Sequence, residues 1–196
     1  GAASLIRATE GTILSRIPPR VRIRQGAPLE LPHIMVLIDD PGNDVLGAVE
    51  AKKAVLRKLY DFDLMMDSGH LSAYGIEESA IEKAVIGGLR TLVDPRIFAM
   101  KYGLRPETPV LLYAIGDGNH SLATAKTIWE SLKETGGDVC TPQAPPLRYA
   151  LVEIVNLHDP ALVFEPIHRV AFDLAPGRNI VEEFIRFSGG RGRYID

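Results

Sequence analysis

The 196-residue sequence contains a single cysteine, Cys140, so no intrachain disulfide is available to it. This excludes a disulfide-stabilised secreted scaffold and favours a reducing compartment. The sequence also lacks an apolar run of the roughly 20 residues that a transmembrane helix needs, and no basic-then-apolar leader opens it. We therefore expect a cytoplasmic protein that has no membrane partner.

Positive charge is not in excess either, because 22 Lys and Arg are balanced by 25 Asp and Glu, which gives a net charge of -3. Since general nucleic-acid binders are usually basic, we expect no nucleic-acid partner. The length favours a single domain over residues 1–196, with a weak candidate boundary in the proline-rich stretch at residues 141–147. Gly1 and Ala2 look like a cloning scar, so we expect a fragment of a longer protein.

Hydrophobic periodicity predicts both strands and helices. Strands are expected where apolar residues alternate or cluster, at residues 20–24, 34–38, 62–66, 110–115 and, as a hairpin, 149–157 with 162–169. Helices are expected where the apolar residues follow the helical repeat, at residues 44–60, 77–93, 95–102, 122–136 and 179–187. This mixture predicts an α+β (mixed α/β) fold with a mixed sheet flanked by helices.

The most informative segment is a polar loop at residues 116–121, Gly-Asp-Gly-Asn-His-Ser, between an apolar strand and an amphipathic helix. The first N–H groups of a helix have no partner inside it and carry a partial positive charge, so they attract anions. The two glycines let the backbone approach a ligand closely. We therefore predict phosphate binding by Gly116, Gly118, Asn119 and Ser121.

The same loop carries a carboxylate and an imidazole. His120 is a candidate to donate to a phosphate oxygen or to move a proton near neutral pH. Asp117 is a candidate base or magnesium ligand, so both are candidate catalytic residues. A structural interpretation stays open, in which Asp117 and Gly118 form a turn, Ser121 caps the helix and His120 packs locally.

Arginines are frequent in the first 24 residues. Arg20, Arg22 and Arg24 alternate with Val21 and Ile23, which predicts a strand with a basic face. Guanidinium groups bind phosphate in a bidentate manner, so these three arginines are candidates to complete an anion pocket. The alternative is a solvated face or a protected sheet edge.

Two adjacent carboxylates, Asp39 and Asp40, follow the strand predicted at residues 34–38. Ligand sites collect at strand ends in open α/β sheets, so this pair is a candidate Mg²⁺ site. The alternative is an ordinary turn, which the sequence Asp-Pro-Gly at residues 40–42 favours. Each histidine also has a carboxylate close in sequence, as His70 has Asp67, but no pair shows the spacing of a zinc site.

Four segments together resemble the family called domain of unknown function 1015, namely residues 5–12, 31–41, 115–126 and 153–160. The resemblance extends over about residues 4–172, and the family has no established activity. Its members are usually longer than this chain, which agrees with the expectation of a fragment.

The Asp-Gly-x-His box is similar, more distantly, to one in the ParB/sulfiredoxin-like superfamily. That group includes nucleotide-binding partition proteins, sulfiredoxin and a free-serine kinase. The resemblance implies a ParB/sulfiredoxin-like core in which the box and the following helix start hold nucleotide phosphates. Asp117, Gly118 and His120 match the box, but Ser121 stands where many relatives have arginine, which removes one phosphate-binding charge.

Our leading hypothesis from the sequence is a nucleotide- or phosphometabolite-binding protein that acts as a phosphotransferase or hydrolase. Its partner would be a small anionic ligand, and its cofactors a nucleotide and Mg²⁺. One alternative is a non-catalytic ligand-binding or regulatory module that uses the same pocket. Another is a scaffold that forms a homo-oligomer through the hairpin predicted at residues 149–169.

Overall fold

The computed structural model of the chain describes residues 3–31, 33–134, 146–163 and 172–190. The chain divides into two compact units, Gly1–Leu162 and Val163–Asp196, and each is described by itself. The first unit combines helices with a sheet that has both parallel and antiparallel strands. This confirms the predicted α+β class.

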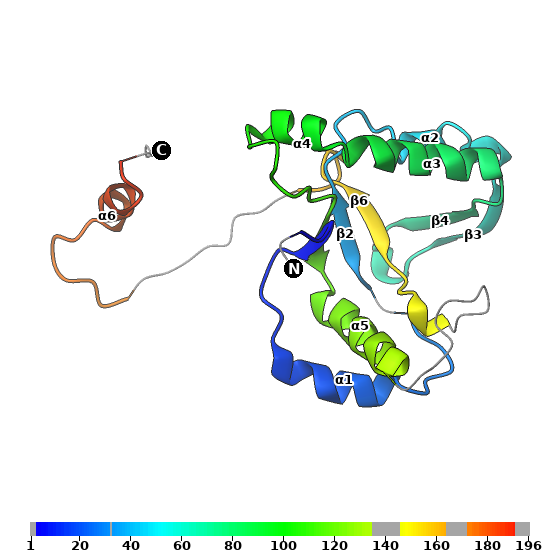
Figure 1. Cartoon of the computed structure of the whole chain (residues 1–196), viewed down its shortest axis with the longest axis horizontal. Helices are drawn as coiled ribbons and strands as arrows, with labels where there is room; N and C mark the ends of the chain where they lie inside the picture. The colour runs from blue at the N-terminus through cyan, green and yellow to red at the C-terminus, as the bar shows by residue number, and fades with distance from the viewer. Residues whose placement is uncertain (1–2, 32, 135–145, 164–171, 191–196) are drawn as a thin grey trace. The chain divides into compact units, whose positions relative to one another are not determined.

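The central sheet has the strand order β1-β5-β2-β6 (Figure 1). Its strands are β1 (Ile6–Ala8), β2 (Met35–Ile38), β5 (Tyr113–Asp117) and β6 (Glu153–Asn156). The pairs β1–β5 and β2–β6 are parallel, whereas β2 and β5 are antiparallel. Buried Ile34, Val36 and Ile115 form the core of this sheet, and Leu122 packs against them.

Helices α1 (Ile17–Arg24) and α5 (Asn119–Glu134) lie side by side, below the sheet in the view of Figure 1. The strand predicted at residues 20–24 is therefore wrong. Pro18 and Pro19 lie in the first turn of α1, where the fixed φ of proline suits a helix. Alternation of apolar and basic residues over five positions does not by itself distinguish a strand from a short exposed helix.

Two further helices, α3 (Ser79–Leu92) and α4 (Pro95–Tyr102), confirm the predictions for residues 77–93 and 95–102. The side chain of Asp94 accepts hydrogen bonds from the amides of Arg96 and Ile97 and so caps α4. Gly103 ends the helix with φ of 62°. Together these local signals explain why this part of the chain was predicted well.

The single long helix predicted for residues 44–60 is wrong. Only α2 (Gly47–Glu50) is α-helical there, and a hairpin of β3 (Arg57–Asp63) and β4 (His70–Gly75) begins soon after it. The hairpin is antiparallel, and pairing across it turns residues 57–60 into a strand despite their helical spacing. Short 3-10 turns occupy Leu14–Arg16, Lys53–Val55, Met65–Asp67 and Pro146–Arg148.

A hairpin was predicted at residues 149–169. In the described part of the chain, β6 instead pairs in parallel with β2. Most of the second predicted strand, at residues 162–169, lies outside the described residues. In the second unit, α6 (Ile180–Phe187) confirms the terminal helix, and Asn179 caps it. Of the helices in the described ranges, none has the length and apolar character needed to cross a membrane.

Candidate functional site

The polar box lies at a very tight junction between β5 and α5. Strand β5 ends at Asp117 and α5 begins at Asn119, so the helix starts three residues earlier than Leu122. Gly118 joins the two elements with φ of 81°. A Cβ atom there would lie 2.4 Å from the carbonyl oxygen of His33, so only glycine fits at this position.

The first amides of α5 have no hydrogen-bond acceptor in the described part of the chain. The N–H of Gly118 donates to Oδ1 of Asp117 at 2.6 Å, and the N–H of Leu122 donates to the carbonyl of Gly118 at 3.0 Å. No described residue accepts a hydrogen bond from the amides of Asn119, His120 or Ser121. These amides form the positive end of a 16-residue helix, as the anion-site prediction requires.

The side chains of the box, by contrast, tie α5 to the N-terminal segment. The N–H of Ile13 donates to Nε2 of His120 at 3.0 Å, so this nitrogen is the acceptor and carries no proton. Asn119, which is 5% exposed, donates through Nδ2 to Oγ1 of Thr12 at 3.2 Å. Three of the predicted site residues, Asp117, Asn119 and His120, thus already have local partners.

A cavity of about 190 Å³ lies beside the first turns of α5. Its described walls combine two basic side chains, one acidic side chain, two hydroxyls and one apolar residue: Arg20, Arg24, Glu30, Ser121, Thr124 and Ile23. Arg20 and Arg24 are one helical turn apart, so the helix places both on one face of α1. Arg22 instead lines a separate groove with Lys126 and Glu130.

Arg24 is the most unusual group in this cavity. Its side chain is only 9% exposed, and its Nε and Nη1 atoms have no hydrogen-bond partner among the described residues. Glu30, whose side chain is 33% exposed, forms an ion pair with Nε but does not meet hydrogen-bond geometry. A buried guanidinium with unused donors is costly and points to a missing acceptor.

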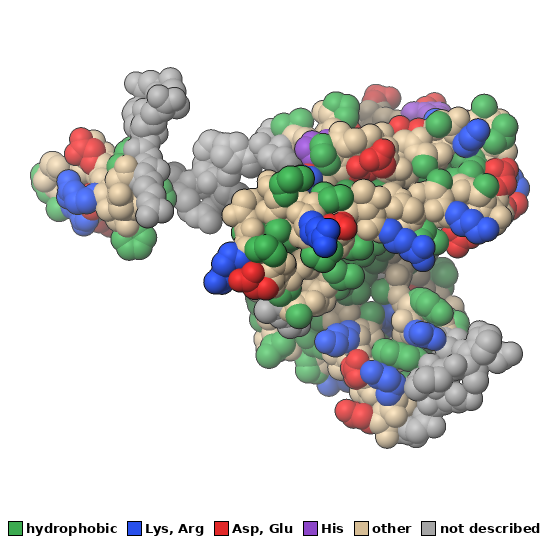
Figure 2. Space-filling model, turned by 45° about the horizontal axis from the view of Figure 1, so that its top comes forward, with side chains coloured by type: hydrophobic (Ala, Val, Ile, Leu, Met, Phe, Trp, Pro, Cys, Tyr) green, Lys and Arg blue, Asp and Glu red, His purple; other side chains and the backbone are tan. Residues whose placement is uncertain are grey.

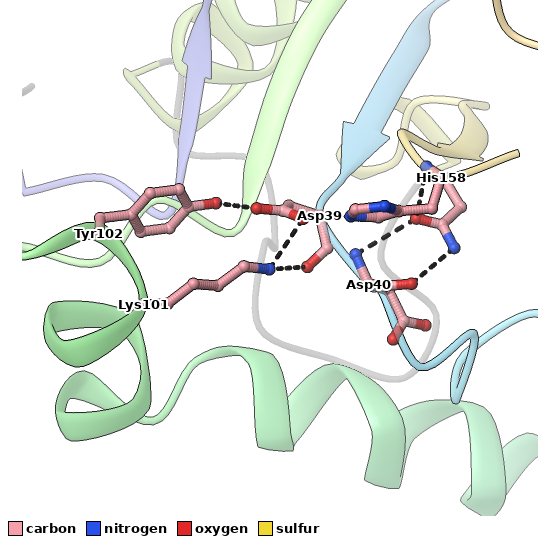
Figure 3. Close-up of polar contacts among 6 residues, drawn as sticks. Asp39, Asp40, Lys101, Tyr102 and His158 are labelled. Atoms are coloured by element: carbon pink, nitrogen blue, oxygen red, sulfur yellow. Dashed lines mark hydrogen bonds and ion pairs between the residues drawn. The ribbon is translucent and has the colours of Figure 1, made fainter.

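Asp39 forms a second polar cluster that sequence analysis did not predict (Figure 3). Its carboxylate binds Nζ of Lys101 at 2.8 Å and Nε2 of His158 at 2.7 Å, and it accepts a hydrogen bond from the Tyr102 hydroxyl. Burial alone would raise the pKa of Asp39, but its three hydrogen-bond donors lower that pKa to about 2. Burial and the adjacent carboxylate raise the pKa of Tyr102 to about 12.

Asp40 stabilises the turn that follows β2. Its side chain is buried, and Oδ2 accepts a hydrogen bond from the N–H of Val45 at 2.8 Å. Its backbone exchanges two hydrogen bonds with the side-chain amide of Asn156. Asp39 and Asp40 therefore have separate partners, and no group of three or more metal-binding side chains occurs within the described ranges. Mg²⁺ binding at this pair stays a prediction.

His33, His70 and His158 each pair with a carboxylate other than the one nearest to it in sequence. His70 binds Asp63 through Nδ1 at 2.7 Å and binds Asp61 through Nε2, rather than Asp67. Asp63 and Asp61 raise the pKa of the His70 imidazole. His33 binds Glu153 at 2.7 Å, whereas His168 lies outside the described residues. Cross-strand pairing and sheet neighbours, which a single sequence does not reveal, create these contacts.

A comparison with protein families finds that the family described as "Protein of unknown function (DUF1015)" matches residues 2–187. The chain therefore belongs to this family, as its sequence segments indicated. Comparisons with curated proteins and with solved structures found no match. The similarity to the ParB/sulfiredoxin-like superfamily stays a prediction.

Proposed function

We propose that this DUF1015 protein binds a phosphate-bearing small molecule, a nucleotide or phosphometabolite, in the cavity between α1 and the start of α5. The observation that carries the proposal is the Arg24 guanidinium, which is buried, lines the cavity and has unused donors. Phosphate oxygens are strong acceptors that match the planar fork of arginine.

The surrounding groups support an anion rather than a neutral ligand. Arg20 adds a second guanidinium, and Ser121 adds a hydroxyl at the third position of α5. The open amides at the start of the same helix add the positive end of its dipole. The cavity walls contain two guanidinium groups and one carboxylate, that of Glu30, so they carry a net positive charge.

Binding without turnover is the better supported form of this function. Catalysis by the box would require Asp117 and His120 to face the ligand, and neither residue lines this cavity. Asp117 accepts from the N–H of Gly118, and Nε2 of His120 accepts from the N–H of Ile13. Both groups hold the junction in place, which favours a ligand-binding module over a phosphotransferase or hydrolase.

Calorimetric titration with inorganic phosphate and with ATP tests the proposal. We expect Arg24→Gln to weaken binding by roughly 10- to 100-fold, because hydrogen bonds to charged groups contribute about 1.5–3 kcal/mol. Arg16→Gln is the matched control, since it removes the same charge from a residue that does not line the cavity. A phosphate-release assay on the same samples should detect no turnover.

Two results would contradict this assignment. If Arg24→Gln lowers the melting temperature but leaves phosphate affinity unchanged, Arg24 has a structural role only. If the unmodified chain releases phosphate from ATP, and His120→Ala abolishes that release while binding remains, the protein is an enzyme.

A further inference from the structure

Glu30 is the one acidic side chain among the described residues that line the anion cavity. It belongs to the segment between α1 and β2, where the described residues form neither helix nor strand. Of the described residues at positions 25–31, all except Glu30 are exposed. Moving Glu30 would therefore break no hydrogen bond of a helix or a sheet.

The carboxylate of Glu30 compensates the positive charge of Arg24, but it leaves hydrogen-bond donors of the guanidinium without an acceptor. A well-placed carboxylate forms two parallel hydrogen bonds with arginine. Here Nε and Nη1 of Arg24 stay without a hydrogen bond although Glu30 is within ion-pair distance of Nε. An anion with better geometry at the same place would recover the hydrogen bonds that Glu30 leaves unmade.

We propose that Glu30 is an internal competitor for the anion site. It pairs with Arg24 when the cavity is empty and leaves the guanidinium when a ligand enters. This inference rests on the proposed function and adds to it the control of ligand affinity and ligand charge. The displaced carboxylate carries one negative charge, so a monoanion gains little by replacing it.

The competition lowers the affinity for every anion by the same factor, so only anions of high intrinsic affinity, such as inorganic phosphate and phosphate monoesters in their dianionic form, displace Glu30. A dianion interacts more strongly with the two guanidiniums of Arg20 and Arg24 than Glu30 does. Its several oxygens can also accept from the Ser121 hydroxyl, which lines the same cavity and to which Glu30 makes no hydrogen bond in the described chain. Small carboxylates carry one charge and two oxygens, so their intrinsic affinity is too low to displace Glu30 readily.

The test is calorimetric titration of the full chain and of Glu30→Gln with inorganic phosphate and with acetate. We expect Glu30→Gln to tighten phosphate binding about tenfold, since the ligand then no longer has to displace a carboxylate from Arg24. Acetate binding should tighten by the same factor, because both anions must displace the same carboxylate, so the preference for phosphate over acetate should not change. Glu82→Gln, which removes a carboxylate from an exposed position of α3, should change neither affinity.

The outcomes separate this inference from the proposed function. If the full chain binds phosphate and Glu30→Gln binds it equally or less tightly, Glu30 is not a competitor, and the proposed function still stands. If neither protein binds phosphate, the proposed function itself fails. Glu30→Asp is a second variant that keeps the charge on a shorter side chain, and we expect it to bind phosphate with an intermediate affinity.

Discussion

Among single residues, Asp39 joins three segments that are far apart in the sequence. It follows β2, whereas Lys101 and Tyr102 lie at the end of α4 and His158 follows β6 (Figure 3). The contact with His158 spans 119 positions in sequence. Adjacent carboxylates suggested a metal site, but the residues that surround Asp39 are mainly hydrogen-bond donors, which only the folded chain brings together.

We expect Asp39→Asn to lower the free energy of unfolding by about 1–3 kcal/mol, because asparagine loses the charge-assisted hydrogen bonds to Lys101 and His158. The pKa of Asp39 is lowered from 3.8 to about 2, so its contribution is present above pH 3.8 and is lost as the pH falls toward 2. Urea unfolding of both proteins at several pH values measures this effect.

The difference between the two proteins should therefore be largest at neutral pH and should shrink below pH 3.8. Asp67→Asn serves as the control, because Asp67 is exposed in the turn between β3 and β4 and asparagine tolerates its φ of 53°. A difference that stays constant down to pH 2 would mean that the carboxylate charge of Asp39 contributes nothing.

At the scale of elements, local signals predicted α3, α4, α6 and β2, because each has clear periodicity or caps. The same signals failed for α1, whose pattern is short and ambiguous. They also failed for β3, because its strand conformation depends on pairing with β4. The polar box at residues 116–121 was recognised as a helix start from its glycines and its neighbours. Its cavity was not predictable in full, since Glu30 reaches Arg24 only through the fold of the segment after α1.

The junction between β5 and α5 leaves no room for a side chain at Gly118. We expect Gly118→Ala to destabilise the protein by about 2–5 kcal/mol, because it combines a positive φ with a clash against the backbone of His33 and Ile34. Gly103→Ala is a matched control, since Gly103 has φ of 62° but open space around it. We expect Gly103→Ala to lower the free energy of unfolding by only about 1 kcal/mol.

Urea unfolding of the two variants separates the clash from the backbone strain. Equal losses of stability would show that β5 and α5 move apart to admit a methyl group, and the tight junction would then not be needed for the fold. A much larger loss for Gly118→Ala is expected, and it should be accompanied by loss of phosphate binding because the start of α5 shifts.

At the scale of the whole molecule, charge is distributed without a strong bias. The face in Figure 2 shows Lys and Arg side chains interspersed with Asp and Glu, as the net charge of -3 suggests. The small cavity beside α5, by contrast, is lined by two arginines and one glutamate. A balanced surface with a local basic cavity suits a small anionic ligand better than an extended polyanion.

The first unit, Gly1–Leu162, contains both sheets and every residue of the candidate anion site. We therefore expect a chain that ends at Leu162 to unfold cooperatively in urea and to bind inorganic phosphate with the affinity of the full chain. Circular dichroism during unfolding and calorimetric titration measure the two properties separately. Cooperative unfolding with lost phosphate binding would show that residues 163–196 supply part of the site, and the cavity between α1 and α5 would then be incomplete on its own.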